Sequence, residues 1–383
     1  MIQTVNSIPA FDNRLQYSTI EAEISAAVLE ILASGRYVGG PVVEGFEKQF
    51  AAYNGVSNCV ACNSGTDALY LALRALDIGA GDEVITTPFT FIATSEVVSM
   101  VGATPVFVDI DAETFNLNLQ QVAAAITPRT KAIIPVHLFG QPVDMTALME
   151  LVSSHSTIAV IEDCAQSTGA TWAGKRVGSI GHIGCFSFYP TKNLGACGDG
   201  GAITTNNPEI AAKLRMLKEH GQKNRYYYEE MGVNSRLDSL QAAILQIKLR
   251  YLDIWNDKRR AIASRYHQHL SLIPGIIAPQ ELTDGMGVWN QYTIRTIAEG
   301  RNGTSAKHRE SIRTQLQEQG VNSMIYYPHP LHLQPVYANL GYQSGQLPAA
   351  ELACNEVLSL PMYPELSEEQ QMQVIYALKE VMS

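Results

Sequence analysis

The sequence predicts an α/β fold, in which a largely parallel β-sheet is covered by helices on both faces. Short apolar runs of strand length recur with helical intervals between them. They lie at residues 83–87, 105–110, 131–136 and 158–162. The chain has 383 residues, which exceeds the size at which one core stops growing. We therefore expect a large domain and a smaller one.

Two helices and a strand precede these runs. Apolar positions at helical spacing predict helices over residues 17–33 and 43–53, separated by the glycine-rich GRYVGGP. Residues 58–62 read as a short apolar strand, and an apolar helix follows through Leu76.

The second half of the chain predicts further helices and the smaller domain. A polar, tyrosine-rich stretch, GQKNRYYYEE, is expected to be an exposed loop, and a long helix from residue 237 to about 266 is expected to link the domains. We place the boundary so that the large domain covers residues 1–254 and the small C-terminal domain covers 255–383. Other predicted elements are helices at residues 208–220, 305–319 and from 367, and a strand at 292–296.

Composition excludes several classes of protein. The net charge of −10 disfavours nucleic acid as a partner, and no apolar run approaches the roughly 18 residues that a membrane span needs. The N-terminal stretch resembles no export signal, so a cytoplasmic location is expected. The six cysteines are scattered as reduced thiols would be. Cys59 and Cys62 form a CxxC pair that no second pair completes, so we expect no metal site.

One lysine stands out between two strands. Residues 183–189 and 200–205 read as strands, and the glycine-containing connection between them carries Lys192. Burial lowers the pKa of a lysine, and the resulting free amine can attack an aldehyde to form a Schiff base. The alternative is an ordinary lysine on a surface loop.

A second pattern suggests an anion site. The sequence NSGTDAL at residues 63–69 follows a strand and opens a helix, so free backbone N–H groups meet the positive end of the helix dipole. A phosphate would bind well there. The alternative is a helix capped by Ser64 or Thr66, with no ligand.

Chemically useful side chains also follow the predicted parallel strands, whose carboxyl ends gather ligands in such sheets. Asp163 comes directly after one strand, with Gln166 nearby, and a buried carboxylate there is costly unless a cation such as a protonated pyridine nitrogen meets it. Phe91 could stack on a planar ring. The alternatives are a helix cap for Asp163, a core position for Phe91, and a hydrogen-bonded core histidine for His137.

Taken together, these motifs resemble those of a known family. The segments GTDAL at 65–69, EDCAQ at 162–166, Ser187 with Lys192, and NSR at 234–236 occur in the order seen in the DegT/DnrJ/EryC1/StrS family of nucleotide-sugar aminotransferases. The resemblance covers nearly the whole chain. It implies fold type I: a large pyridoxal-phosphate-binding domain with a mostly parallel seven-stranded sheet flanked by helices, and a smaller C-terminal α/β domain.

The resemblance also implies the roles of individual residues. Lys192 would form the Schiff base with pyridoxal phosphate and carry the proton, while Asp163 would hold the pyridine nitrogen. Other residues would contact the remaining parts of the cofactor. Gln166 would contact the phenolic oxygen, and Phe91 would stack on the ring. Gly65, Thr66 and Ser187 would bind the phosphate. The protein would be a homodimer in which Asn234 of the partner subunit also reaches this phosphate. Because Lys192 is kept, the dehydratases in which histidine replaces this lysine are excluded.

The substrate implied is a nucleotide sugar, with glutamate as the amino donor. The block SFYPTK followed by GDGG is similar to the branch that aminates C3, so a 3-keto-6-deoxyhexose is favoured. A 2-acetamido-3-keto-hexuronate, amination at C4, a pyridoxal-phosphate enzyme acting on amino acids, and a non-catalytic regulator are the alternatives. Candidate substrate-binding residues are Tyr189, Arg236, Tyr327, His329 and His332.

Overall fold

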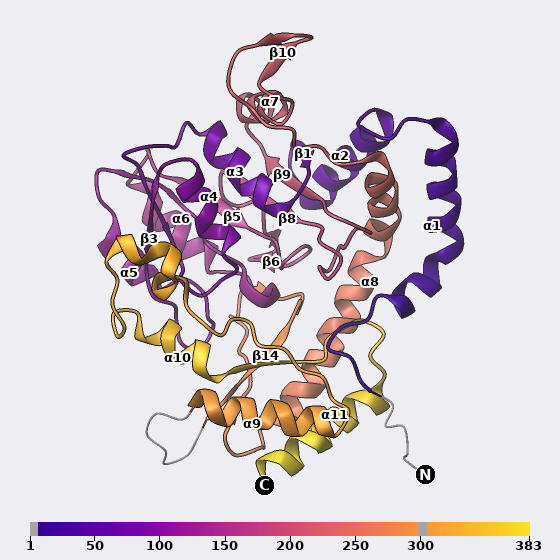
Figure 1. Ribbon diagram of the computed structural model, residues 1–383, viewed down its shortest axis with the longest axis vertical. Helices are drawn as coiled ribbons and strands as arrows, with labels where there is room; N and C mark the ends of the chain where they lie inside the picture. Colours follow the sequence, from indigo (N-terminus) through magenta and orange to yellow (C-terminus); the bar gives the residue numbers. More distant parts are fainter. Residues whose placement is uncertain (1–6, 298–304) are drawn as a thin grey trace.

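A computed structural model describes residues 7–297 and 305–383, and its core is a seven-stranded sheet (Figure 1). Only β9 runs against its neighbours, so the predicted α/β fold with a mostly parallel sheet is confirmed. In their spatial order the strands are β1 (Asn58–Cys62), β9 (Gly201–Thr205), β8 (Ile183–Ser187), β5 (Ala159–Asp163), β4 (Thr130–Ile133), β2 (Glu83–Thr86) and β3 (Thr104–Phe107).

Helices cover both faces of this sheet because successive strand residues point to opposite sides. On β5, for example, Ile161 packs on one face and Val160 on the other. The first face is covered by α3 (Gly65–Ala75), α4 (Ala93–Met100) and α7 (Pro208–Leu217). The second is covered by α2 (Pro41–Asn54), α5 (Leu119–Ala125), α6 (Met145–Ser153) and the first part of α8 (Ser239–Leu270).

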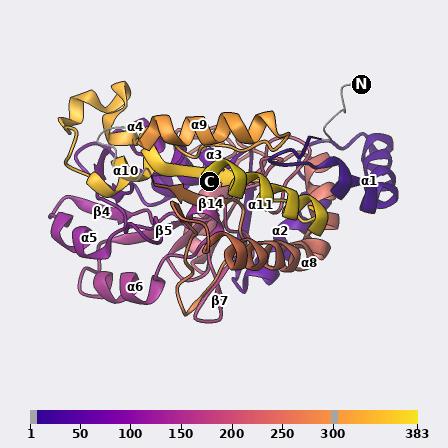
Figure 2. The same ribbon diagram turned by 90° about the horizontal axis from the view of Figure 1, so that it is seen from below.

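Helix α8 belongs to two hydrophobic cores. Leu245 packs with the large sheet, whereas Tyr266 lies in a C-terminal cluster that Ile8 from the N-terminal segment also joins. Figure 2 shows α11 between α9 and α8 in this C-terminal part. Its elements are β12 (Ile276–Ile277), β14 (Tyr292–Thr296), β15 (Val357–Leu360), α9 (Ser305–Glu318), α10 (Pro348–Glu356) and α11 (Glu368–Met382). A boundary at residue 254 would fall inside α8, and the division into domains stays a prediction.

Most predicted elements are found with small shifts, including the first helix, α1 (Arg14–Ser34). The tyrosine-rich stretch expected to be a loop is instead an exposed hairpin that projects from the body (Figure 1). Its strands are β10 (Gln222–Asn224) and β11 (Tyr227–Tyr228), and Tyr226 makes the turn with a positive φ of 65°. A small sheet is formed by β6 (Thr171–Trp172), β7 (Lys175–Arg176) and β13 (Gly285–Met286). Within the described ranges, every helix is too short or too polar to cross a membrane.

Candidate active site

Lys192 lies on the tight connection between β8 and β9. The backbone N–H of Lys192 donates to the carbonyl of Tyr189 at 2.9 Å. Gly195 then comes so close to Pro190 that an added Cβ would lie 2.5 Å from the Pro190 carbonyl oxygen, which explains the glycine. Burial of the side chain lowers the pKa of Lys192 to about 8, against the opposing effect of the Asp163 carboxylate. The neutral amine is therefore more abundant near neutral pH than in a free lysine.

Asp163 ends β5 and is almost completely buried. Its carboxylate accepts hydrogen bonds from the Thr94 hydroxyl at 2.8 Å and from the Ala165 backbone N–H at 3.1 Å. Burial nevertheless raises the pKa of Asp163, although those two donors, Lys192 and His137 act the other way. A cation placed against this carboxylate would supply the counter-charge that it lacks.

The N-terminus of α3 packs against Ser187 at the end of β8. The Ser64 hydroxyl accepts a hydrogen bond from the Asp67 N–H at 3.1 Å, so the earlier N–H groups, those of Gly65 and Thr66, have no partner within the helix. An added Cβ on Gly65 would lie 2.7 Å from the Ser187 Cβ. Gly65, Thr66 and Ser187 are thus brought together, with N–H and hydroxyl donors of the kind that a phosphate requires.

Gln166 connects the sheet edge to the C-terminal part. Its side-chain oxygen accepts from the Phe139 N–H at 2.7 Å, and its Nε2 donates to the Tyr327 hydroxyl at 3.1 Å. Because an amide nitrogen has two N–H groups, one remains for a ligand. The Phe91 ring is 55% exposed and lies 6.5 Å from the ring of Tyr327, measured between centroids. Burial raises the pKa of Tyr327.

The segment with Asn234 and Arg236 lies beside the α3 end. The Ser235 hydroxyl between them donates to Asp67 at 2.7 Å and accepts from the Asn63 N–H at 3.2 Å. Asn234 itself is exposed, and Arg236 forms a 3.5 Å ion pair with Glu219 in the same chain.

The remaining predicted substrate residues differ in their surroundings. Tyr189 is 53% exposed and His329 is exposed. His332 is buried and pairs with Glu351 at 3.2 Å, and burial lowers the pKa of His332. Its contacts thus lie with α10 and away from the Lys192 turn.

His137 is a hydrogen-bonded histidine of the core, which is the alternative stated for it above. Its Nδ1 accepts from the Val143 N–H at 3.0 Å, so its Nε2 carries the proton and donates to Glu162 at 3.1 Å. Glu162 also accepts from the backbone N–H groups of Gly178, Ile180 and Gly181. The buried pair is therefore fully satisfied by hydrogen bonds.

Sequence reasoning missed the residues that support the site. Thr94, in the first turns of α4, holds Asp163. Asn290, just before β14, donates to the Thr191 carbonyl at 3.3 Å. Nothing in the local pattern of either segment distinguishes these two residues from ordinary helix or loop residues, because their partners are remote in sequence.

Comparisons with known proteins show which family the chain belongs to. A family model described as the DegT/DnrJ/EryC1/StrS aminotransferase family matches residues 18–379. The dTDP-3-amino-3,4,6-trideoxy-alpha-D-glucose transaminase of Streptomyces venezuelae is 45% identical, over 97% of this chain and 96% of the relative. A protein of Geobacillus stearothermophilus named pleiotropic regulatory protein is 47% identical, over 98% of both chains. The crystal structure of NtdA from Bacillus subtilis with bound cofactor PMP has a TM-score of 0.91 and 34% identity, over 100% of this chain and 86% of that one.

A mostly parallel sheet with a partly buried lysine, a buried aspartate and an open helix N-terminus at one edge is the arrangement of a pyridoxal-phosphate-dependent enzyme of fold type I. The chain belongs to the DegT/DnrJ/EryC1/StrS aminotransferase family. It is a sugar aminotransferase whose cofactor is pyridoxal phosphate. The residues present fit that cofactor, since burial raises the pKa of the Asp163 carboxyl and a cationic ring nitrogen would stabilise its charged form, and since Gly65 at the start of α3 lies against Ser187.

Proposed function

We propose that this enzyme transfers an amino group to a nucleoside-diphosphate-linked 3-keto sugar, with glutamate as donor, and so produces a 3-amino sugar nucleotide. The observation that carries the proposal is the presence of Lys192 and Asp163 in one buried site. The 3-amino sugar named for the Streptomyces venezuelae relative supports C3 as the position of amination. The SFYPTK block, with Tyr189 beside the sugar, supports the same position.

In this proposal Lys192 and Asp163 do the chemistry. Lys192 would hold the cofactor covalently through its amine, and once displaced by substrate the same amine would take and return the proton at the reacting carbon. A pKa of about 8 suits this work, because the amine can both accept and release a proton near neutral pH. Asp163 would keep the pyridine nitrogen protonated. When bound, pyridoxal phosphate supplies the electron sink.

Other side chains would hold the cofactor in place. The N–H groups of Gly65 and Thr66 and the hydroxyl of Ser187 would bind the phosphate. Gln166 would donate its free N–H to the phenolic oxygen, and Phe91 would cover the ring. Asn234 would complete the phosphate site of the partner subunit, a role supported by its exposure next to the anchored Ser235. The protein is therefore proposed to act as a homodimer with shared active sites.

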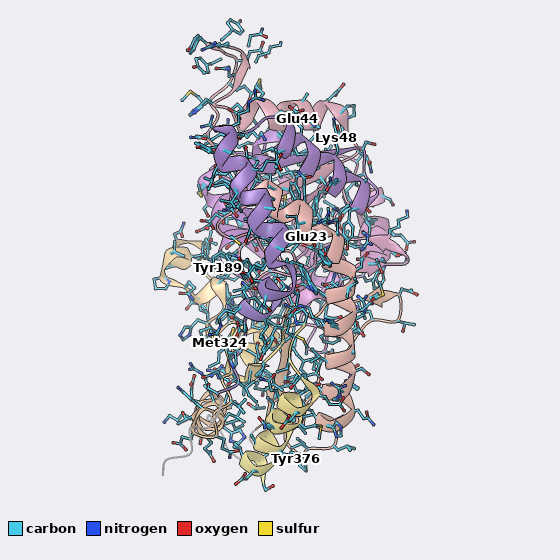
Figure 3. All side chains as sticks on the ribbon, turned by 90° about the vertical axis from the view of Figure 1, so that its right-hand side faces the viewer. Glu23, Glu44, Lys48, Tyr189, Met324 and Tyr376 are labelled. Carbon is cyan, nitrogen blue, oxygen red and sulfur yellow. The ribbon has the colours of Figure 1, made fainter. Side chains whose placement is uncertain are left out.

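A pocket beside the Lys192 turn supports a neutral sugar. It has a volume of about 400 Å³ and includes Thr191 next to Lys192 and Tyr326 next to Tyr327. Met324 lies below Tyr189 at this side of the molecule (Figure 3) and also lines the pocket. No charged side chain lines it among the described residues. A sugar with a C6 methyl group fits such a lining, whereas a carboxylate would find no cationic partner there.

A uronate remains the second candidate because Arg236 could form a bidentate ion pair with a carboxylate. Against this, Glu219 already pairs with Arg236.

The six cysteines form no disulfide in the described residues, which is in keeping with the proposed cytoplasmic location.

The test supplies 3-keto and 4-keto nucleotide sugars with glutamate and locates the new amine by NMR. Amination at C3 is expected, and amination at C4 alone would overturn the assignment.

A second experiment compares two substrates that differ only in carrying a methyl or a carboxylate group at C5. Met324→Arg should improve the use of the carboxylate, and Met286→Arg is the matched control, since both methionines are 41% exposed. Faster turnover of the carboxylate by the unaltered enzyme would refute the neutral sugar.

A further inference from the structure

Three of the side chains that hold the turn carrying Lys192 come from distant parts of the chain. Each donates a hydrogen bond to a backbone carbonyl of the turn. The pairs are Asn13 Nδ2 to Pro190 at 2.9 Å, Asn290 Nδ2 to Thr191 at 3.3 Å, and Lys248 Nζ to Gly195 at 2.7 Å. Two of these donors are neutral amides, and the third is a lysine.

Lys248 is an unusual choice for this position. It lies on α8 and is only 6% exposed, and no carboxylate of the described residues lies within ion-pair distance of its ammonium. Burial lowers the pKa of Lys248, while Cys197 and Glu365 favour its charged form only weakly. A methionine of similar volume would fill this space without the unfavourable burial of a charge. The contact with Gly195 is thus what the lysine contributes.

A hydrogen bond to the carbonyl of Gly195 can hold the turn in place. The turn closes on itself through the Ala196 N–H, which donates to the Phe188 carbonyl at 2.7 Å. Between these two residues Gly195 approaches Pro190 too closely for any side chain. The far end of the turn therefore has no side chain of its own with which to anchor itself. An external donor at the Gly195 carbonyl supplies that anchor.

Helix α8 is a suitable base for such a donor. It packs against the large sheet through Leu245 and Leu252. Its Asn256 accepts a 2.7 Å hydrogen bond from Asn193, the residue after Lys192. Gln241, also on α8, accepts a 2.8 Å hydrogen bond from the Cys197 N–H. Three side chains of one helix therefore hold the residues that follow Lys192.

We propose that Lys248 is a positioning residue for Lys192: by holding the Gly195 carbonyl, its ammonium fixes the turn so that the Lys192 amine stays beside Asp163. The proposal rests on the function proposed for Lys192. It assigns Lys248 no contact with the substrate or the cofactor.

The test compares Lys248→Met, which keeps the volume and loses the donor, with Lys248→Arg, which keeps a charged donor. The control is Lys218→Met, because Lys218 also donates to a carbonyl at 2.7 Å, that of Ala61 in β1. Hydrogen exchange of residues 189–197 is followed by mass spectrometry in the protein without cofactor. The second readout is kcat and KM of the holoenzyme with the keto sugar.

In Lys248→Met, we expect faster exchange in this peptide and a kcat lowered at least about tenfold, with KM nearly unchanged, because misplacement by ~1 Å can cost roughly 100-fold in rate. Lys248→Arg should have an exchange rate and a kcat close to those of the unaltered enzyme. Lys218→Met should change neither the exchange rate nor kcat. Unchanged exchange in Lys248→Met, or equal losses in Lys218→Met, would overturn the proposal. Faster exchange with an unchanged kcat would overturn it too, because the turn would then loosen without displacing the Lys192 amine. Turnover of Lys192→Ala tests the role of Lys192 separately. If Lys248→Met does not fold, Lys248→Leu, which also lacks a hydrogen-bond donor, serves the same comparison.

Discussion

Thr94 and Asp163 are joined by a 2.8 Å hydrogen bond in which the threonine hydroxyl donates to the buried carboxylate. The bond links the first turns of α4 to the end of β5, so a side chain on a helix stabilises the charge at the end of a strand. We expect Thr94→Val to raise the pKa of Asp163 further above its ordinary value, because one of its two hydrogen-bond donors is lost.

The rate should follow this change. A hydrogen bond to a charged group contributes about 1.5–3 kcal/mol, so kcat of Thr94→Val should fall roughly ten- to hundredfold while pyridoxal phosphate still binds. Thr314→Val, which removes an exposed hydroxyl on α9, is the control and should leave kcat unchanged. A normal kcat in Thr94→Val would show that Asp163 does not depend on this donor.

Asp163→Asn tests the carboxylate itself. The variant should bind pyridoxal phosphate, because the phosphate contacts come from other residues, but it should lose most of its rate, because an amide cannot keep a pyridine nitrogen protonated. Absorption spectra measure binding, and single-turnover kinetics measure the rate. Rates close to those of the unaltered enzyme would leave Asp163 with a structural role only.

Lys192 should make stability depend on pH. Burial lowers its pKa from 10.5 to about 8, so between these pH values the unfolded chain binds a proton that the folded chain does not. The free energy of unfolding therefore rises with pH across this window, and below pH 8 the charged amine costs up to about 3 kcal/mol.

Lys192→Met removes that cost and should raise the Tm of the cofactor-free protein at pH 7, with the gain disappearing toward pH 10.5. Turnover should be abolished at every pH. Lys175→Met, at an exposed position in β7, is the control for losing a charge. Equal Tm values for Lys192→Met and the unaltered protein at pH 7 would contradict the burial of the amine.

Shared active sites can be tested with mixed dimers. Lys192→Ala and the double variant Asn234→Ala/Arg236→Ala should each be inactive, because each lacks one part of every site. After subunit exchange, hybrids carry one intact site, so up to about half of the activity per hybrid dimer should return. Incubation of Lys192→Ala alone shows the background. Without recovery despite proven exchange, each site would belong to one chain.

Much of the fold follows from local patterns. The strand at residues 58–62 is found with the same bounds because apolar residues end at a polar turn, and Lys192 stands out because glycines flank it. The sequence pattern predicts a loop where the structure has the hairpin Gln222–Tyr228, since its few strand residues lack an apolar face. The supports Thr94, Asn290 and Lys248 were missed for a different reason: each acts on a residue far along the chain, which only the fold brings near.

Helix α8 also limits how the molecule can move. It is a continuous helix of 32 residues, about 48 Å long, whose first part packs with the large sheet and whose last part packs with the C-terminal cluster. A hinge between these two parts would have to bend or break the helix near the middle. Enclosure of a substrate should therefore come from loops and side chains, such as Tyr189 and the segment around Tyr326, rather than from swinging one half of the chain as a rigid lid.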